Sequence, residues 1–580
     1  MNAFLGDVQI GSVLLCILTQ ELIYVSQYLG PTGCGKTSLL NILTGRKNPH
    51  DFSGQVFVDK YSSLSSCKYM VGYVVQDNII CGTLTVRENL MFSVNLRLPN
   101  NVPDNERRER VKKIIIDLGL ESCADTIVGT EYLRGISGGE QKRACIGMEL
   151  VLSPKILFLD EPTTGLDAST AQNVMEYLKK LSQNGCTIIF SIHQPRYTIF
   201  KLFDIVLLMT KGKSIYHGSA SAMLDYFETQ GYLCELHNNP ADFVLDILID
   251  VNRKSNDMQK LKEAYLKSDM HTEINSLLRK QLGKDNFKKF HEKFQMTTAR
   301  SLSTEIFFVS QRTFKNAIRN PAVFLCQMVV AILLGLLMGS TFCDLKKTIE
   351  PGIQNRLGAL NIISVWQMFS SATALEVFIK ERALFMDEYT SGYYRISAFF
   401  IAKLICDILA MRILSSTIFS LLTYFMMGLE RNMRHFFVFL ITILMTSVFG
   451  SALCFFVAAV IPVFAAASVV VAFVFIVMIV FSGYIITLDS IFSWLSWIKW
   501  ISAVRYSCNV LVINEFRHSN FCLTNRSDIC PVMGSRVLRK LAVDYATDWD
   551  MWKYFFGLTM MTITCFLLAY FQLYRMRKTK

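Results

Sequence analysis

The chain has 580 residues, too many for one compact hydrophobic core, so two or more domains are expected. Hydrophobic residues make up 52% of it and charged residues 18%, more apolar than an average soluble protein, and the apolar excess lies in the second half. The net charge of +12 is modest for this length and indicates Lys and Arg on the cytoplasmic side of a membrane rather than binding to nucleic acid.

The N-terminal residues 1–21 form an atypical segment. Their apolar run, residues 13–18, is too short to span a bilayer. A signal peptide requires a basic start, and no Lys or Arg precedes Lys36. A buried strand or an unusual terminus is therefore the better interpretation.

A glycine-rich segment with the spacing G-x-x-x-x-G-K-T follows a predicted strand, residues 22–29, and precedes a predicted helix, residues 38–46. Its residues are Gly30, Pro31, Thr32, Gly33, Cys34, Gly35, Lys36, Thr37 and Ser38. The backbone N–H groups of such a loop surround phosphate oxygens. Lys36 reaches the β- and γ-phosphates, and the Thr37 hydroxyl suits Mg²⁺.

Short apolar runs alternate with helical patterns through residues 22–250, which predicts an α/β domain with a largely parallel sheet. The expected strands are residues 71–75, 156–160, 187–192 and 205–209. Thr85 and Glu88 have the spacing of a capping box at the start of a helix.

Polar residues follow several of these strands. Gln76 follows one, Asp160 and Glu161 follow a buried one, and His193 follows the next. An Asp at this place beside a phosphate loop can hold Mg²⁺, and the next acid can polarise an attacking water. A second anion site is expected where Ser137, Gly138, Gly139 and Glu140 open a helix.

Together these motifs resemble the nucleotide-binding domain of ATP-binding-cassette (ABC) transporters. Walker A corresponds to Gly30–Thr37, the Q-loop to Gln76, the signature to Ile136–Glu140 (ISGGE in place of LSGGQ), Walker B to Ile156–Asp160, the D-loop to Gly165–Asp167 and the switch histidine to His193. The segments GTLTVREN, DEPTTGLD, FSIHQPRY and NNPADF are similar to the G subfamily, the white and breast-cancer-resistance-protein group. The resemblance covers the chain from residue 29 to its end.

The resemblance implies an α/β P-loop nucleotide-binding domain followed by an all-α domain with six transmembrane helices. ATP and Mg²⁺ are the implied cofactors. Lys36 and the loop amides would hold phosphate; Thr37, Gln76 and Asp160 would hold Mg²⁺; Glu161 would activate water and His193 would contact the γ-phosphate. Each ATP would lie between the Walker A of one chain and the signature of another, so the chain would act as a homodimer or as a heterodimer with another G-type half-transporter.

The expected function is ATP-driven export of amphipathic small molecules or lipids across the plasma membrane, with the ATPase domain in the cytoplasm. The alternative is a non-transporting or regulatory G-type subunit with impaired nucleotide binding. That alternative rests on the segment before Gly30, which does not resemble the family's start of the ATPase domain, where an aromatic residue stacks on adenine. Tyr24 or Tyr28 could take that role; otherwise adenine binding is weakened while the phosphate contacts remain. Cys34 suggests that thiol alkylation blocks ATPase activity.

Residues 251–300 carry 12 Lys and Arg against 6 Asp and Glu, which predicts a polar linker with loose helical content, the alternative being an arm that binds lipid or nucleic acid. The membrane domain, residues 301–580, is expected to span the bilayer at about 322–342, 357–379, 398–427, 436–460, 464–487 and 554–574. The resemblance implies that Lys380–Arg395, between the second and third spans, contacts the ATPase domain; an ordinary polar loop is the alternative.

Residues 489–552 are expected to form a long outer loop. Its aromatic stretch, residues 492–500, is typical of a re-entrant or interfacial element. Asn525 begins a glycosylation sequon, and the flanking Cys522 and Cys530 are expected to pair within or between chains.

By resemblance, a substrate cavity between two chains would be lined by residues of the second span and of the end of the fifth. The corresponding positions are Asn361, Ile362, Trp366, Phe369 and Tyr484. Helix packing or lipid contact is the alternative role for these side chains.

Overall fold

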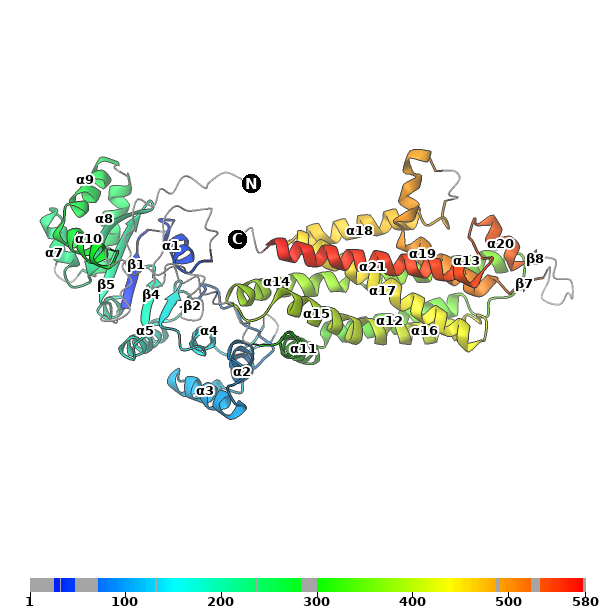
Figure 1. The fold of residues 1–580 in the computed structure, drawn as a ribbon, viewed down its shortest axis with the longest axis horizontal. Helices are drawn as coiled ribbons and strands as arrows, with labels where there is room; N and C mark the ends of the chain where they lie inside the picture. The colour runs from blue at the N-terminus through cyan, green and yellow to red at the C-terminus, as the bar shows by residue number, and fades with distance from the viewer. Residues whose placement is uncertain are drawn as a thin grey trace. The chain divides into compact units, whose positions relative to one another are not determined.

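The computed structural model describes residues 25–31, 33–46, 71–130, 133–235, 238–253, 255–282, 300–486, 491–522 and 532–576. These residues form two compact units. The first unit ends at Phe308 and also includes Met386–Arg395, and the second comprises Val309–Phe385 and Ile396–Lys578. Figure 1 shows the sheet of the first unit and the long helices of the second.

The first unit is built on a six-stranded sheet in the order β2-β3-β4-β1-β5-β6. Five strands pair in parallel and the edge strand β6 pairs antiparallel with β5. Their bounds are β1 Val25–Leu29, β2 Val71–Val74, β3 Ile156–Leu159, β4 Thr187–Ser191, β5 Ile205–Thr210 and β6 Lys213–Ser219. Five of the predicted strands are thereby confirmed, and β6, whose residues mix polar and apolar types, was not predicted.

Helices flank this sheet. They are α1 Lys36–Leu43, α2 Val86–Arg97, α3 Asp104–Asp117, η3 Glu121–Cys123, α4 Gly138–Leu150, α5 Ala168–Gln183, α6 Tyr197–Phe200, α7 Met223–Thr229, α8 Pro240–Arg253, α9 Ser255–Leu266 and α10 Asp269–Leu282. The apolar face of α1 packs on the sheet, where Leu39, Leu40 and Leu43 share a core cluster with Tyr28 and Phe158. This packing fixes the phosphate loop, which lies between β1 and α1.

The first part of the predicted linker, residues 251–282, forms more helix than expected. Helix α8 runs through residue 250 without a break, and α9 packs against both α8 and β6. Tyr265 of α9 is buried, although the segment around it is rich in charge. The expectation of only loose helical content is therefore wrong for residues 251–282, because a few spaced apolar side chains suffice to dock an otherwise polar helix.

The second unit consists mainly of long helices. They are α11 Leu302–Arg319, which begins in the first unit, α12 Ala322–Thr341, α13 Gly352–Ser370, α14 Thr373–Thr390, α15 Ile396–Cys406, the π-helix η4 Asp407–Ile413, α16 Leu414–Met426, α17 Met433–Val460, α18 Phe464–Val480, η6 Ser493–Trp500, α19 Ala503–Phe516, α20 Gly534–Lys540 and α21 Asp548–Met576. A short pair, β7 Asn520–Phe521 and β8 Val532–Met533, joins α19 to α20. Helix α17 packs along α21, and α12 packs along α16 (Figure 1).

Four helical stretches among the described residues are long and apolar enough to cross a membrane: Ala322–Thr341, Gly352–Thr390, Met433–Val460 and Trp549–Met576. Two further predicted spans correspond to the 17-residue α18 and to α15, η4 and α16, which the π-helix interrupts. The second span begins earlier than predicted, at Gly352, and α13 gives way to α14 at Ser371.

The expected outer loop contains a helix that the hydropathy pattern did not reveal. Helix α19 is almost entirely buried and packs against α13, α17 and α21. It carries buried polar residues, among them Arg505, Asn509 and Glu515, which lower the mean hydropathy of this segment. The aromatic stretch before it forms η6, whose side chains are not buried.

Met386–Arg395 packs within the first unit, as the resemblance implied. The Tyr393 ring stacks on Phe92, and its hydroxyl lies 3.3 Å from the Ser93 hydroxyl. The Arg97 guanidinium lies 4.6 Å from the centre of the same ring and pairs with Glu149 at 3.0 Å. Both members of this ion pair are buried, so each depends on the other for its solvation.

Replacing Glu149 with Gln leaves the Arg97 charge buried without its counterion, which we expect to cost about 3 kcal/mol or more. Thermal unfolding of the purified full chain in lipid should then show the transition of the ATPase unit lowered by about 6–12 °C. The matched control is Arg87→Gln, which breaks an exposed pair with Asp125 and should cost below about 1 kcal/mol. Equal shifts in the two variants would contradict the prediction.

Candidate active site

The phosphate loop depends on glycine at particular positions. Gly33 and Gly35 have φ of +80° and +103°, a region that residues with a Cβ rarely adopt. A Cβ on Gly30 would lie 2.2 Å from the carbonyl oxygen of Met209, so no larger residue fits there. Thr32 lies outside the described residues. The loop leads directly into α1, whose first N–H groups add the partial positive charge of a helix N-terminus.

Lys36 is buried at the start of α1 and folds back over the loop. Its ammonium donates to the carbonyl oxygens of Gly30 at 2.6 Å and Pro31 at 3.3 Å. The loop thus combines a lysine ammonium bonded to the loop carbonyls, open space beside Gly33 and Gly35, and a helix N-terminus. These features fit the triphosphate of a nucleotide.

Asp160 follows β3 and lies within reach of two hydroxyl groups. The Thr37 hydroxyl is 3.3 Å from its Oδ1, and the Ser191 hydroxyl donates to the same oxygen at 2.5 Å. A carboxylate beside a hydroxyl at the phosphate loop is a donor set that suits Mg²⁺, which keeps most of its water ligands.

Glu161 is held in place by three contacts. Its backbone N–H donates to the Ser191 hydroxyl at 3.0 Å. Its Oε2 accepts from Gln76 Nε2 and from the Thr164 hydroxyl, each at 2.9 Å. Its φ of +47° turns the chain sharply at the end of β3. The predicted residues Thr37, Gln76, Asp160 and Glu161 therefore lie together, while His193 is exposed just beyond the end of β4.

The signature residues lie at the N-terminus of α4. The Glu140 carboxylate accepts from the backbone N–H and the hydroxyl of Ser137, both at 2.8 Å, and the Ser137 hydroxyl accepts from the Glu140 N–H. Burial acts to raise the pKa of Glu140, but the two donors of Ser137, the charge of Arg143 and the Cys123 thiol together lower that pKa. Gly138 is exposed, and Gly139 packs against Thr170.

Two residues that the sequence analysis did not select help to organise the site. The Ser191 hydroxyl bridges Asp160 and Glu161 from the neighbouring strand. Lys142 of α4 donates to the carbonyl oxygens of Val75 and Gln76 at 3.0 and 2.9 Å, which ties the signature helix to the Gln76 loop. The available signals were the SIHQ strand end and a lysine two residues after Glu140.

Tyr28 does not offer a surface for adenine. Its ring is buried in the core beneath α1, with 1% of the residue exposed, and burial raises the pKa of its hydroxyl. The suggestion that Tyr28 stacks on adenine is therefore wrong, and Tyr24 lies outside the described residues.

The positions expected to line the substrate cavity have different surroundings within one chain. Asn361 accepts a weak hydrogen bond from the Cys508 thiol, and the Tyr484 hydroxyl donates to Asn509 at 2.9 Å. Phe369 packs edge-on against Phe475. Trp366 packs against the core of the membrane unit and Ile362 is 40% exposed. In the outer segment Cys522 is disulfide-bonded, and Asn525 and Cys530 lie outside the described residues.

The phosphate loop, the two carboxylates after β3 and the parallel sheet define a P-loop ATPase joined to a helical membrane unit. A family model described as ABC transporter matches residues 22–164, and two described as ABC-2 type transporter match residues 193–272 and 304–516.

Curated relatives match nearly the whole chain. The broad substrate specificity ATP-binding cassette transporter ABCG2 of Bos taurus is 41% identical over 578 residues, which cover 95% of this chain and 88% of that protein. The protein of the same name from Mus musculus is also 41% identical, and ATP-binding cassette sub-family G member 3 of Mus musculus is 32% identical, with the same shares covered. The chain belongs to the G subfamily of ABC transporters. It is an integral membrane half-transporter that uses its ABC ATPase to export substrates.

Replacing Ser191 with Ala removes the bridge between Asp160 and the Glu161 backbone. We expect ATPase kcat in lipid to fall about tenfold or more, because the two carboxylates lose the hydroxyl that connects them and the partly buried N–H of Glu161 loses its partner. Ser219→Ala, at an exposed hydroxyl at the end of β6, is the matched control and should retain full activity. A fully active Ser191→Ala enzyme would show that the bridge does not position the carboxylates.

Alkylation of Cys34 should be slow at neutral pH. Its thiol is buried, and burial raises its pKa despite the opposing influence of Lys36 3.9 Å away, so less of the reactive thiolate is present at pH 7. We expect the labelling rate, followed by peptide mass spectrometry, to increase as the pH rises above 9 and ATPase activity to fall in step with labelling. The exposed Cys343 is the internal reference and should react first. Equal rates at pH 7 would contradict this assignment.

Proposed function

We propose that this half-transporter exports amphipathic small molecules or lipids and works as a dimer. Its apolar second unit, with helices long enough to cross a bilayer, supports passage of ligands that partition into lipid. The name of its cow and mouse relatives, a broad substrate specificity transporter, supports a wide substrate range. Asn361, Ile362, Trp366, Phe369 and Tyr484 remain our proposed cavity residues, to which the second chain would add its own set.

The cluster around Asp160 and Glu161 is the observation that carries the proposed ATPase chemistry. In this proposal Lys36 and the loop amides hold the phosphates, and Thr37, Gln76 and Asp160 hold Mg²⁺. That ion would neutralise charge on the transferred phosphoryl group. Glu161 accepts a proton from the attacking water, and Gln76 and Thr164 orient its carboxylate for that task. His193, exposed beyond β4, contacts the γ-phosphate.

A dimer follows from the proposed role of the signature motif. Ser137 and Gly138 are exposed at the N-terminus of α4, a place suited to an anion. We infer that this motif completes the ATP site of a partner chain, either a second copy or another G-type half-transporter. The proposed domains are residues 22–250 for the ATPase in the cytoplasm and residues 301–580 for the membrane, which we infer to be the plasma membrane.

The buried position of Tyr28 supports the second candidate, a subunit with weakened adenine binding. In that case the phosphate contacts supply most of the affinity, so ATP and inorganic triphosphate, which has no base, should bind about equally well. A clear preference for ATP would favour the transporting subunit with a complete nucleotide site.

Glu161→Gln separates the two candidates. If the chain is an active transporter, the wild type hydrolyses ATP in lipid and Glu161→Gln lowers kcat about a hundredfold or more, because Gln cannot accept the proton of water. Export of an amphipathic dye by vesicles that contain the Glu161→Gln variant should stop as well. The control Glu176→Gln, on the exposed face of α5, should behave as wild type. Absence of hydrolysis in both the wild type and Glu161→Gln, with normal folding, would favour the regulatory subunit.

A further inference from the structure

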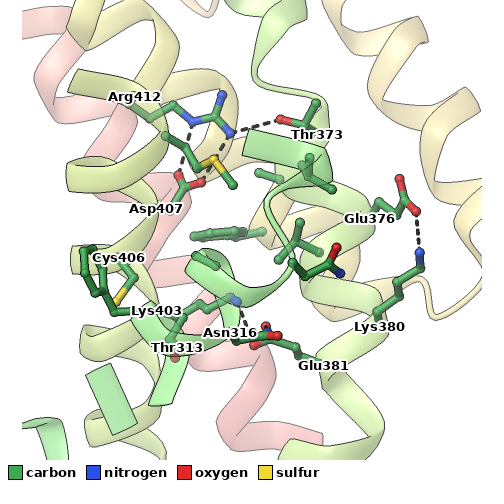
Figure 2. Close-up of a pocket in the computed structure, with 18 residues that line it drawn as sticks. Thr313, Asn316, Thr373, Glu376, Lys380, Glu381, Lys403, Cys406, Asp407 and Arg412 are labelled. Atoms are coloured by element: carbon green, nitrogen blue, oxygen red, sulfur yellow. Dashed lines mark hydrogen bonds and ion pairs between the residues drawn. The ribbon is translucent and has the colours of Figure 1, made fainter. Parts of the chain in front are cut away.

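A cavity of about 180 Å³ lies within the membrane unit, between α11, α14, α15 and η4 (Figure 2). Its wall combines apolar side chains such as Phe314 and Phe455 with several charged ones. Pockets for drug-sized ligands usually measure about 300–1,000 Å³, so this cavity suits a small polar group rather than a whole transported molecule.

The order of elements along the chain places the cavity at one end of the first and second spans. Thr313 and Asn316 belong to the last turns of α11, and Val323 belongs to the first turn of α12. Helix α14, which supplies Thr373 to Glu381, leads on to the segment that packs with the ATPase unit. The cavity therefore lies at the end of these helices that is connected through the chain to the ATPase unit, which is the end in the cytoplasmic leaflet if the ATPase is cytoplasmic as proposed.

Three ion pairs surround the cavity. Lys403 pairs with Glu381 at 2.6 Å, Lys380 pairs with Glu376 at 2.6 Å, and Arg412 pairs with Asp407 at 3.3 Å. The side chains of Lys403 and Arg412 are only 6% and 1% exposed. Charges at this depth are costly in lipid and therefore indicate function. The three pairs sum to zero charge, which complements a ligand that carries one positive and one negative group.

The π-helix explains why two of these charges meet. In a regular α-helix, residues five apart point about 140° away from each other. In η4 the hydrogen-bond register shifts to i→i+5, which allows Asp407 and Arg412 to pair. Such π-bulges are frequent at functional sites.

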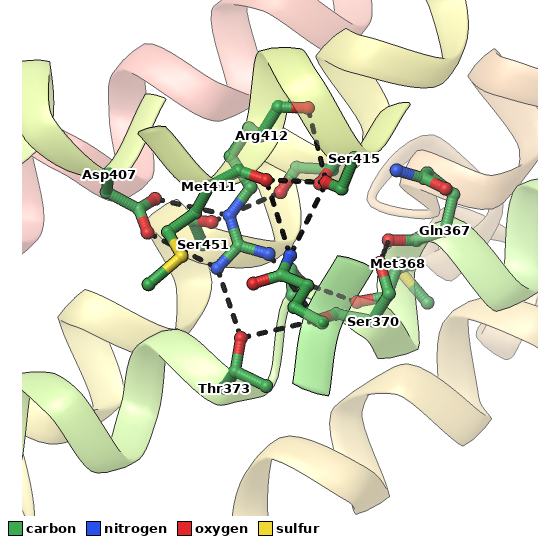
Figure 3. A network of polar contacts seen from close by, with 12 residues as sticks. Gln367, Met368, Ser370, Thr373, Asp407, Met411, Arg412, Ser415 and Ser451 are labelled. Carbon is green, nitrogen blue, oxygen red and sulfur yellow. Dashed lines mark hydrogen bonds and ion pairs between the residues drawn. The ribbon is translucent and has the colours of Figure 1, made fainter. Parts of the chain in front are cut away.

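Arg412 is buried, and the hydrogen bonds of its guanidinium are long (Figure 3). Its contacts with Asp407, the Ser370 carbonyl and the Thr373 hydroxyl measure 3.3–3.4 Å. Charge-assisted hydrogen bonds of a guanidinium normally measure about 2.7–2.9 Å. These hydrogen bonds are long for a guanidinium, and a phosphate oxygen inside the cavity could approach Arg412 more closely than its present acceptors do.

We propose that this cavity binds a zwitterionic phospho-ammonium group, as in the head group of phosphatidylethanolamine from the cytoplasmic leaflet. Its phosphate pairs with Arg412, and its primary ammonium donates to the carboxylates of Glu376 and Glu381. The acyl chains lie against exposed apolar residues of α11 and α12 such as Phe314 and Leu325. This lipid is a bound component of the transporter, distinct from the exported substrate.

The test uses the purified full chain exchanged through mixed vesicles of phosphatidylethanolamine, phosphatidylcholine and phosphatidylglycerol. Lipid retained per chain after detergent washing is counted by native mass spectrometry. Phosphatidylethanolamine should be retained above the other two lipids. Arg412→Gln should lower its retention about tenfold, the value of one lost charge-assisted contact. Glu376→Gln, at the exposed rim, should lower it as well because it removes a carboxylate that accepts from the lipid ammonium, and it provides the measurement if Arg412→Gln fails to fold.

Glu430→Gln is the matched control, because it removes a carboxylate from an exposed ion pair with Lys347 outside the cavity. It should retain the lipid as the wild type does. A further arm adds free phosphoethanolamine to phosphatidylcholine vesicles; protection of the cavity from labelling at Cys406 would show that the soluble head group binds without acyl chains. Equal retention of the three lipids, or unchanged retention in both Arg412→Gln and Glu376→Gln, would overturn the proposal.

Discussion

The Ser191 hydroxyl positions the two acidic residues that follow β3, Asp160 and Glu161. It donates to Asp160 and accepts from the backbone of Glu161, so one side chain on β4 determines the geometry of the two acids after β3. Glu161 has a positive φ, a conformation that costs a non-glycine residue about 1 kcal/mol or more. The hydrogen bond to Ser191 helps to offset that cost, and the resulting turn directs the Glu161 carboxylate toward Gln76.

Several buried charges of the membrane unit likewise have a charged partner. Arg356 pairs with Glu515 and donates to the Leu345 carbonyl, and Glu515 also accepts from the backbone of Glu430. Lys403 likewise pairs with Glu381. Removing one partner of such a pair is expected to cost more than removing both, because the remaining charge would stay buried. These pairs therefore fix which helices can be neighbours.

The sequence predicted well where one local pattern determines structure. The short apolar runs of β3 and β4 indicated buried parallel strands, and the phosphate loop needs glycine wherever it occurs. The sequence predicted structure poorly where an element depends on contacts with distant parts of the chain. Helix α19 is buried by neighbouring helices although it contains Arg505 and Glu515. The π-helix η4 depends on a shift in the backbone hydrogen-bond register, which a hydropathy pattern does not reveal. Ser191 matters only because β4 lies beside β3.

One short helix connects the phosphate loop to the segment between the second and third spans. Helix α1 begins at Lys36, and Arg46 follows its end. Arg46 pairs with Asp387 at 3.2 Å, donates to the Ser391 hydroxyl at 2.8 Å and lies over the ring of Tyr73 on β2. Tyr73 is three residues before Gln76, so the same guanidinium contacts the strand that carries the Gln76 loop. The Arg46 side chain therefore joins three parts of the ATPase unit: the end of α1, the strand that leads to Gln76 and the segment that carries Asp387.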